Sequence, residues 1–328
     1  MVRQYFRNCR RYRFLALLPV AIAMATSFAS AASGAEPVKI IVPVSPGSSL
    51  DLVARVMADQ IGRAQGLTMI VENRPGASTA IGTEAVARAT PDGQTLLAAG
   101  TGFVINPLLR KTSYDPLLSF APICQLVRSP TVIAVSSSAP YATLADLFKA
   151  ARGQPGQLSL ASIGPGSTAH LAFEKLKREA GIDMTFVPYP GAAPAFDAML
   201  GQHVTAYLGE VSFIGAQEKA GTVRALAVAS PQRLATMPDT PTLRELGFSD
   251  VLAELWFGIL APAKTPKKTI DHLAEVYATA LQSPDIETKL NELGLYPTGI
   301  CGADFAAFLG GQVDAYAKII AEAGIKGE

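Results

Sequence analysis

Two short segments of this chain have residue types and spacing suited to holding an anion. Residues 158–170 read as an apolar strand, a turn of glycine and hydroxyl residues and the start of a helix, and residues 38–51 repeat that order. Backbone N–H groups at a helix N-terminus point outward and favour negative charge, and serine or threonine adds further donors. The pattern predicts two anion-binding loops that together clamp a small carboxylate.

The first loop is residues 45–49: Ser45, Pro46, Gly47, Ser48 and Ser49. By itself it can be only a tight turn that ends in an N-cap serine. Asp51 then lies in the first helical turn, where the helix dipole favours an acid. The functional interpretation therefore depends on the presence of two such loops rather than on either one.

The second loop, residues 164–170, formally matches the dinucleotide pattern G-x-G-x-x-A and follows a strand. The next strand, 184–187, runs into Pro188 instead of ending in the acidic residue that binds a ribose, which argues against a nucleotide site. His170 lies in the first turn of the following helix. One role is to orient the loop or to meet a ligand, the other is to pack against the neighbouring strand, and the sequence leaves both open.

Enzymatic chemistry has weaker support in the sequence. There is no G-x-S-x-G, S-x-x-K or H-E-x-x-H motif, and no cluster of His, Cys, Asp and Glu at metal-ligand spacing. His203 and His272 fall on or near expected helices, where we expect structural roles. We therefore expect no catalytic residue, no metal and no cofactor.

Residues 1–35 are interpreted as a secretory signal peptide, which predicts a periplasmic protein. Five arginines precede a short apolar run, Phe14 to Ala25, and small residues follow, with one A-x-A cleavage option at 29–31. The apolar run is shorter than the roughly 20 residues that cross a bilayer, which disfavours an uncleaved anchor. No later segment is apolar enough to span a membrane, so we expect a soluble mature protein.

The charge balance changes once the signal is removed. Residues 1–35 hold five of the 28 basic residues and none of the 27 acidic ones, so the mature chain carries a net charge of about −4. Without a basic run, we expect no nucleic-acid partner. Cys124 and Cys301 also remain, and an exported protein can pair them, but a core of this size does not require a disulfide. The sequence does not determine whether they pair, although pairing is the less favoured outcome.

Strands and helices alternate along the mature chain, which predicts an α/β fold with parallel-type sheets. Short apolar runs predict strands at 38–44, 68–72, 95–99, 131–135, 158–161, 184–187, 204–208, 223–229 and 256–260. Helical spacing places Leu50, Val53, Ala54, Met57 and Ile61 on one buried face.

Capping residues predict where several helices begin. Thr143 and Asp146 form a capping pair, and Thr265-Pro266 and Ser283-Pro284 each place a cap residue before a proline. The last part of the chain is predicted to be nearly all helix, at 266–282, 284–293 and 303–323.

Taken together, the motifs resemble those of Bug-type extracytoplasmic solute receptors of tripartite tricarboxylate transporters, from Pro37 to the C-terminus. The matching segments are IVPVSPG (41–47), VENRPGA (71–77), IG (81–82), TPDG (90–93), INP (105–107), FAPI (120–123), GPGSTAH (164–170), VPY (187–189), RALAV (224–228) and WFGILAP (256–262). Each segment is weakly specific by itself, but so many in the same order are highly specific.

The resemblance implies a two-lobed, type II periplasmic-binding-protein fold with the ligand in a cleft between the lobes. Lobe one is expected at 37–128 and 250–328, and lobe two at 129–249. In this family the two loops pinch a ligand carboxylate, and the carry-over by position implies the following ligand-binding residues. They are Ser45, Pro46, Gly47, Ser48, Ser49, Thr101, Asn106, Gly164, Gly166, Ser167, Thr168, His170, Tyr189, Gly191, Ala192, Gly209 and Glu210.

The chain also departs from the family pattern around the expected pocket. In the first loop, Ser48 stands where family members commonly have a second glycine. Val44 stands where an aromatic residue is usual, and Leu50 stands where a hydroxyl residue is common. The run Leu208-Gly209-Glu210 stands where Phe-Asp-Asn is common, and Pro190 replaces a basic or polar residue. The two loops that bind the carboxylate keep the family pattern, but the residues at the other end of the expected pocket differ. An aliphatic or aromatic carboxylate or an amino acid is therefore expected as a ligand as readily as a tricarboxylate.

The resemblance therefore implies a periplasmic solute-binding protein that delivers a small carboxylate to the membrane permease of a tripartite tricarboxylate transporter. One alternative is a receptor that presents the same ligand to a membrane sensor kinase, and another is an exported hydrolase, which the missing nucleophile–base set opposes. We expect a monomer.

Overall fold

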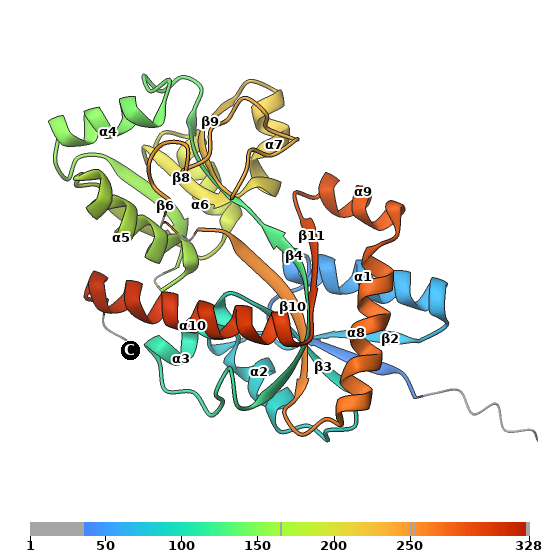
Figure 1. Ribbon diagram of the computed structural model, residues 1–328. Coiled ribbons are helices and arrows are strands. Elements are labelled where there is room, and N and C mark those ends of the chain that lie inside the picture. The colour runs from blue at the N-terminus through green and yellow to red at the C-terminus, as the bar shows by residue number, and fades with distance from the viewer. Residues whose placement is uncertain (1–35, 165, 250, 252, 326–328) are drawn as a thin grey trace, which may run out of the picture. The chain divides into compact units, whose positions relative to one another are not determined.

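The computed structural model describes residues 36–325 other than 165, 250 and 252, and these form two β-sheets with helices on both faces of each (Figure 1). The predicted signal peptide lies outside the described residues. The fold class predicted from the sequence, α/β, is confirmed.

The first sheet has the strand order β11-β4-β10-β3-β1-β2. Its strands are β1 (Val38–Val42), β2 (Met69–Asn73), β3 (Thr95–Gly100), β4 (Phe120–Ser129), β10 (Leu255–Pro262) and β11 (Tyr296–Cys301). Its helices are α1 (Ser49–Gln65), α2 (Ala80–Ala87), α3 (Gly102–Leu109), α8 (Lys267–Leu281), α9 (Pro284–Glu292) and α10 (Ala303–Ala323), with a short 3₁₀ turn η1 (Ala77–Thr79). Buried side chains place α1, α8 and α9 on one face and α2, α3 and α10 on the other.

The second sheet has the strand order β7-β6-β8-β5-β9. Its strands are β5 (Thr131–Ser136), β6 (Ser159–Ile163), β7 (Thr185–Tyr189), β8 (Ala206–Glu210) and β9 (Val223–Ala229). Helices α4 (Leu144–Gly153) and α5 (Thr168–Ala180) cover one face, and α6 (Ala192–Leu200) and α7 (Val211–Lys219) cover the other. The predicted lobe boundaries themselves stay a prediction.

Both sheets are mixed, so the prediction of parallel-type sheets was wrong. The groups β3-β1-β2 and β7-β6-β8 are parallel, but β10 is antiparallel to β3 and β4, and β5 is antiparallel to β8 and β9. The reason lies in the connections between the sheets. The chain leaves the first sheet where β4 ends and returns through β10 at the same edge, so β10 must run in the opposite direction.

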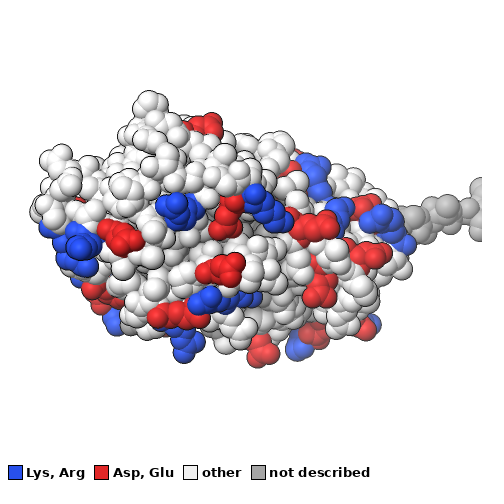
Figure 2. Space-filling model, turned by 90° about the horizontal axis from the view of Figure 1, so that it is seen from above, with Lys and Arg blue, Asp and Glu red and all other residues white. Residues whose placement is uncertain are grey.

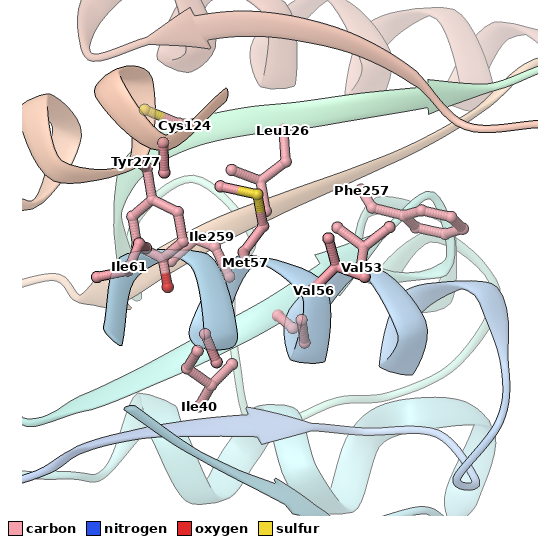
Figure 3. Close-up of a cluster of buried hydrophobic side chains, with 14 of the residues drawn as sticks. Ile40, Val53, Val56, Met57, Ile61, Cys124, Leu126, Phe257, Ile259 and Tyr277 are labelled. Carbon is pink, nitrogen blue, oxygen red and sulfur yellow. The ribbon is translucent and has the colours of Figure 1, made fainter. Parts of the chain in front are cut away.

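The core between α1 and the first sheet follows the predicted helical face. Leu50, Val53, Ala54, Met57 and Ile61 are all buried. Figure 3 shows Val53, Val56, Met57 and Ile61 pointing toward side chains of β4, β10 and α8. Burial of this face fixes the direction of α1 and therefore the position of the loop that precedes it.

Most predicted elements are confirmed within one or two residues, but β4 and β11 were missed. Thr143 and Asp146 form the predicted capping box, and Ser283 precedes Pro284 at the start of α9. The prediction for Thr265 was wrong. Pro266 is extended and takes the N-cap position of α8, and the buried Thr265 hydroxyl makes no hydrogen bond within the described residues.

Cys124 and Cys301 form a disulfide, the outcome that the sequence left open but disfavoured. The two residues lie opposite each other on the antiparallel strands β4 and β11, with Cα atoms 4.0 Å apart. The bond closes a sequence separation of 177 residues and fastens the edge strand β11 to the first sheet.

Charged residues of both signs are interspersed on the molecular face in Figure 2, which shows no extended patch of one sign. Among the helices of the described residues, none combines the length and the apolar character needed to span a membrane.

Candidate functional site

The predicted site residues lie at the ends of parallel strands. The first loop follows β1, and Asn73 and Thr101 come at the ends of the neighbouring strands β2 and β3. The second loop follows β6, with Tyr189 at the end of β7 and Glu210 at the end of β8. Parallel strands place their carboxyl ends on one edge of a sheet, where α/β proteins bind ligands.

The two loops use the same local geometry. Gly47 and Gly166 have φ angles of 82° and 71°, a left-handed conformation that favours glycine. The next residue in each loop, Ser48 or Ser167, is the N-cap, and its hydroxyl accepts a hydrogen bond from the backbone N–H three residues later. Each glycine N–H is also bonded within its own loop and donates to the side chain four residues later.

In the first loop, that acceptor is Asp51. The Gly47 N–H donates to Asp51 Oδ2 at 2.9 Å, Arg55 Nε donates to the same oxygen at 3.0 Å, and Asn73 Nδ2 donates to Oδ1 at 2.8 Å. Asn73 also donates to the Val44 carbonyl at 3.1 Å. Although burial opposes ionisation, these hydrogen bonds and the charge of Arg55 lower the pKa of Asp51. A buried carboxylate therefore holds the first loop in place.

In the second loop, the acceptor is His170, whose Nδ1 accepts the Gly166 N–H at 3.1 Å. The imidazole ring stacks on Phe186 of β7 with a centroid distance of 4.3 Å. Burial lowers the pKa of His170, which keeps Nδ1 free to accept. His170 therefore packs on the neighbouring strand and also orients the loop, while its contact with a ligand stays a prediction.

Four backbone donors remain at the two helix starts. The N–H groups of Ser49 and Leu50 in α1, and of Thr168 and Ala169 in α5, donate no hydrogen bond within the described part of the chain. They are the first two residues of each helix, where no intrahelical partner exists. These donors suit an anion that approaches both helices.

Glu210 connects the second sheet to the first loop. Ser129 Oγ at the end of β4 donates to Glu210 Oε2 at 3.0 Å, and the Ser49 hydroxyl is the other polar group beside this carboxylate. Burial raises the pKa of Glu210, and the two hydroxyls only partly offset that effect. The carboxyl edges of the two sheets therefore meet at Glu210.

The remaining predicted residues have different surroundings. Thr101 and Asn106 are buried, and their side chains already have partners. Thr101 Oγ1 accepts the Trp256 N–H at 3.3 Å, and Asn106 Nδ2 donates to the Ser78 carbonyl and to Thr79 Oγ1. Asn106 thus supports the turn at 77–79, where three non-glycine residues have positive φ angles. Contact between Thr101 or Asn106 and a ligand stays a prediction.

Tyr189, Gly191 and Ala192 lie next to the second loop. The Gly164 N–H donates to the Tyr189 carbonyl at 3.1 Å, and Gly191 and Ala192 are the N-cap and first residue of α6. The second loop also packs on α3 beside the first sheet, because a Cβ on Gly166 would lie 2.7 Å from Leu109 Cδ1.

Comparison with known proteins identifies the family. Residues 53–325 match the family described as Tripartite tricarboxylate transporter family receptor. The chain belongs to this receptor family. Protein BugT of Bordetella pertussis is 30% identical over 320 residues, which is 96% of this chain and 98% of BugT.

Two solved structures are also similar to the receptor. The periplasmic binding protein BugD has a TM-score of 0.77 and 32% identity, with coverage of 89% of this chain and 99% of BugD. The R. palustris Rpa4515 protein, solved with adipate, has a TM-score of 0.80 and 30% identity, with coverage of 89% and 98%. The predicted resemblance and the periplasmic-binding-protein fold are therefore confirmed, and the family consists of periplasmic binding receptors rather than enzymes.

The receptor also contains a cavity of about 500 Å³ that no predicted site residue lines. It lies among β4, β10, α10 and the segment that leads from β9 to β10. The ion pair between Arg128 and Glu254, 3.0 Å apart, borders it through Glu254. Because both loops lie elsewhere, this cavity is not the predicted carboxylate site.

Sequence reasoning missed four residues that shape the receptor's site. It assigned Asp51 only a helix-dipole role, and it gave no role to Asn73 or Ser129. Tyr207 was treated only as a landmark, although its buried hydroxyl has no partner among the described residues and lies beside Gly209. The available signal was the position of Asn73 directly after the predicted strand at 68–72, next to the expected first loop.

Proposed function

We propose that this receptor captures a small carboxylate-bearing solute in the periplasm and delivers it to the membrane permease of a tripartite tricarboxylate transporter. The observation that carries the proposal is the pair of loops with matched geometry, Ser45–Ser49 and Gly164–His170, at the carboxyl edges of the two sheets. Residues 1–35 act as the export signal, and the receptor works as a monomer.

The free donors at the starts of α1 and α5 bind the ligand. A carboxylate loses its hydration when lobes 37–128 plus 250–328 and 129–249 close around it, and this costs several kcal/mol unless its oxygens are hydrogen-bonded. Neutral amides and hydroxyls at helix starts provide these bonds without a cationic side chain. Adipate in the related R. palustris protein supports a small carboxylate as the ligand class.

A thermal-shift screen tests this function. The panel contains mono-, di- and tricarboxylates, aromatic acids and amino acids. A ligand at 100 times its Kd stabilises the protein by about 2.7 kcal/mol, which raises Tm measurably. If no compound of the panel raised Tm, the result would contradict the proposal.

A matched pair of cap variants locates the site. Ser167→Ala removes the N-cap hydroxyl of α5 in the second loop, and Thr143→Ala removes the one of α4, outside both loops. Each is expected to lower stability by about 1 kcal/mol. Only Ser167→Ala is expected to weaken ligand binding as well, by about tenfold; equal Kd values in the two variants would place the ligand elsewhere.

Transport is tested in cells that lack the receptor. Loss of uptake of the ligand, restored by the wild-type chain, is the expected result. Preserved uptake with loss of ligand-dependent gene induction would instead indicate the sensor-kinase alternative.

A further inference from the structure

The carboxylate of Glu210 has no cationic partner within the part of the chain that the structure describes. Its contacts are hydroxyls, those of Ser129 and Ser49. The nearest elements do carry arginines, but these are paired with other acids. Arg55 of α1 binds Asp51, and Arg128 of β4 binds Glu254. Burial without a counter-charge is costly for a carboxylate and raises the pKa of Glu210, so a cation from outside the chain would stabilise its ionised form.

A second polar group lies close to the strand end at Glu210. Gly209 has no side chain, and the space that a Cβ would occupy is filled by Tyr207 Oη, which would lie 1.9 Å from it. The tyrosine hydroxyl is therefore next to the end of β8, where it is buried and has no hydrogen-bond partner among the described residues. Glu210 and Tyr207 together offer a negative charge and an unpaired hydroxyl at the same strand end.

The two ends of the proposed ligand site consequently differ in charge. The second loop has no acidic residue in the first turn of α5, and its loop acceptor is a neutral imidazole, so its free N–H groups attract an anion. The first loop has Asp51 in the first turn of α1 and Glu210 beside Ser49. A carboxylate held between the two helix starts is therefore favoured toward the second loop, and Glu210 favours a cation beside the first.

We propose that Glu210 is a specificity-determining residue that selects amino carboxylates over dicarboxylates. The ligand carboxylate binds the free N–H groups of the two helix starts, and its protonated amine pairs with Glu210 beside the first loop. This inference rests on the proposed solute-binding function and narrows its ligand class. A dicarboxylate would bring a second negative charge against Glu210, which disfavours it by like-charge repulsion.

Isothermal titration calorimetry with matched ligand pairs tests the proposal. Each pair keeps the carbon skeleton and exchanges one carboxylate for an ammonium group: glycine and malonate, alanine and methylmalonate, β-alanine and succinate, 4-aminobutyrate and glutarate, 5-aminopentanoate and adipate. We expect at least one amine to bind about tenfold or more tightly than its dicarboxylate, the ratio that corresponds to ~1.4 kcal/mol.

Two variants assign the preference to Glu210. Glu210→Gln keeps the size of the side chain and removes its charge, and it is expected to bring the affinity ratio within each pair close to one or to reverse it. Glu275→Gln makes the same change at an exposed position on α8 and is expected to leave the ratio unchanged. Ser129→Ala, which frees the Glu210 carboxylate, gives a smaller loss of preference and an independent test if Glu210→Gln does not fold.

The outcomes separate this inference from the function on which it rests. Dicarboxylates that bind as tightly as their amine partners in the wild type would overturn the role of Glu210 and leave the receptor function standing. An amine preference that persists in Glu210→Gln would do the same. No binding by any member of the panel or by any other carboxylate would overturn both.

Discussion

The first and second loops share one backbone design but are held by opposite chemistry. The sequence Ser-Pro-Gly-Ser-Ser-Leu-Asp at 45–51 aligns with Gly-Pro-Gly-Ser-Thr-Ala-His at 164–170, position by position. In both, the glycine N–H donates to the last residue of the segment, but that residue is an ionised Asp51 in one loop and a neutral His170 in the other. Two helix starts of equal geometry can therefore present different potentials to the two ends of one ligand.

The two loops are also held to the rest of the protein by different contacts. Asp51 joins α1, the first loop and β2 through Arg55, Gly47 and Asn73, so the first loop is fixed by a charged network within one sheet. The second loop is fixed by a ring stack on Phe186 and by the packing of Gly166 against Leu109. The first loop therefore depends on hydrogen bonds to one buried carboxylate, and the second depends on shape.

Replacement of Asp51 is expected to have the largest effect. Asp51→Ala leaves the Gly47 N–H, the Asn73 amide and the Arg55 guanidinium without their shared acceptor, and we expect a loss of about 2–4 kcal/mol in the free energy of unfolding. Urea denaturation measures it. Asp59→Ala, which removes an exposed ion pair to Arg63 on the same helix, is the control and is expected to cost less than about 0.5 kcal/mol. Equal losses in both variants would mean that the buried network contributes nothing.

The two glycines give the next largest contrast. Gly47→Ala meets no atom within 4 Å and incurs only the positive-φ cost, about 1 kcal/mol. Gly166→Ala incurs the same cost and also forces Leu109 to move, so we expect about 2 kcal/mol. Thermal unfolding of the two variants measures the difference. A larger loss for Gly47→Ala would contradict the view that the second loop is the one fixed by shape.

The sequence predicted the parts of this arrangement that are encoded locally. The N-cap serine of the first loop and the apolar face of α1 are short-range signals, and both were confirmed. Long-range partners were not accessible. The roles of Asp51 and Asn73 depend on the pairing of β1 with β2, and the disulfide depends on β11 pairing with β4 across 177 residues.

The missed strands have a physical explanation in their residues. β11 contains Pro297 and Gly299, and both residue types are rare inside strands. The proline is tolerated because β11 is an edge strand. β4 contains Gln125 and Arg128, which interrupt its apolar pattern. The burial of Thr101 and Asn106 was equally hidden, because their partners Trp256 and the turn at 77–79 come from other parts of the chain.

The two N-cap serines are expected to behave alike, which tests the shared part of the design. Ser48→Ala and Ser167→Ala each remove one hydroxyl that accepts a backbone N–H at 3.3 and 3.2 Å, so each is expected to cost about 1 kcal/mol in unfolding free energy. Ser167 Oγ also donates to the Ile163 carbonyl at 2.9 Å, but this bond is exposed, so water replaces it and its loss adds little. Replacement by glycine is expected to restore most of the loss. A difference greater than about 1 kcal/mol between the two alanine variants would show that the capping interactions are not equivalent.

The smallest expected effect is a pH dependence of the free energy of unfolding, which differs between the two loops. Burial lowers the pKa of His170 below its ordinary value of 6.5. Between 6.5 and the lowered pKa the unfolded chain therefore binds a proton at this residue and the folded chain does not. The free energy of unfolding consequently falls as the pH falls through that window, by no more than about 1.4 kcal/mol per pH unit, and is unaffected above it.

Asp51 holds the first loop as an anion rather than as a neutral base, and its contribution to stability is lost only at much lower pH. Its lowered pKa means that the folded chain keeps the carboxylate ionised while the unfolded chain takes up a proton near 3.8, so this loss begins around that pH.

Urea denaturation from pH 7 downward, compared between the wild type and His170→Gln, isolates the histidine; His272→Gln on α8 is the control. If the wild type and His170→Gln had the same slope below pH 6.5, the imidazole would not hold the second loop as a neutral acceptor. A wild-type slope of opposite sign would mean that the folded loop prefers the imidazolium, and the difference in charge between the two loops would then disappear at acidic pH.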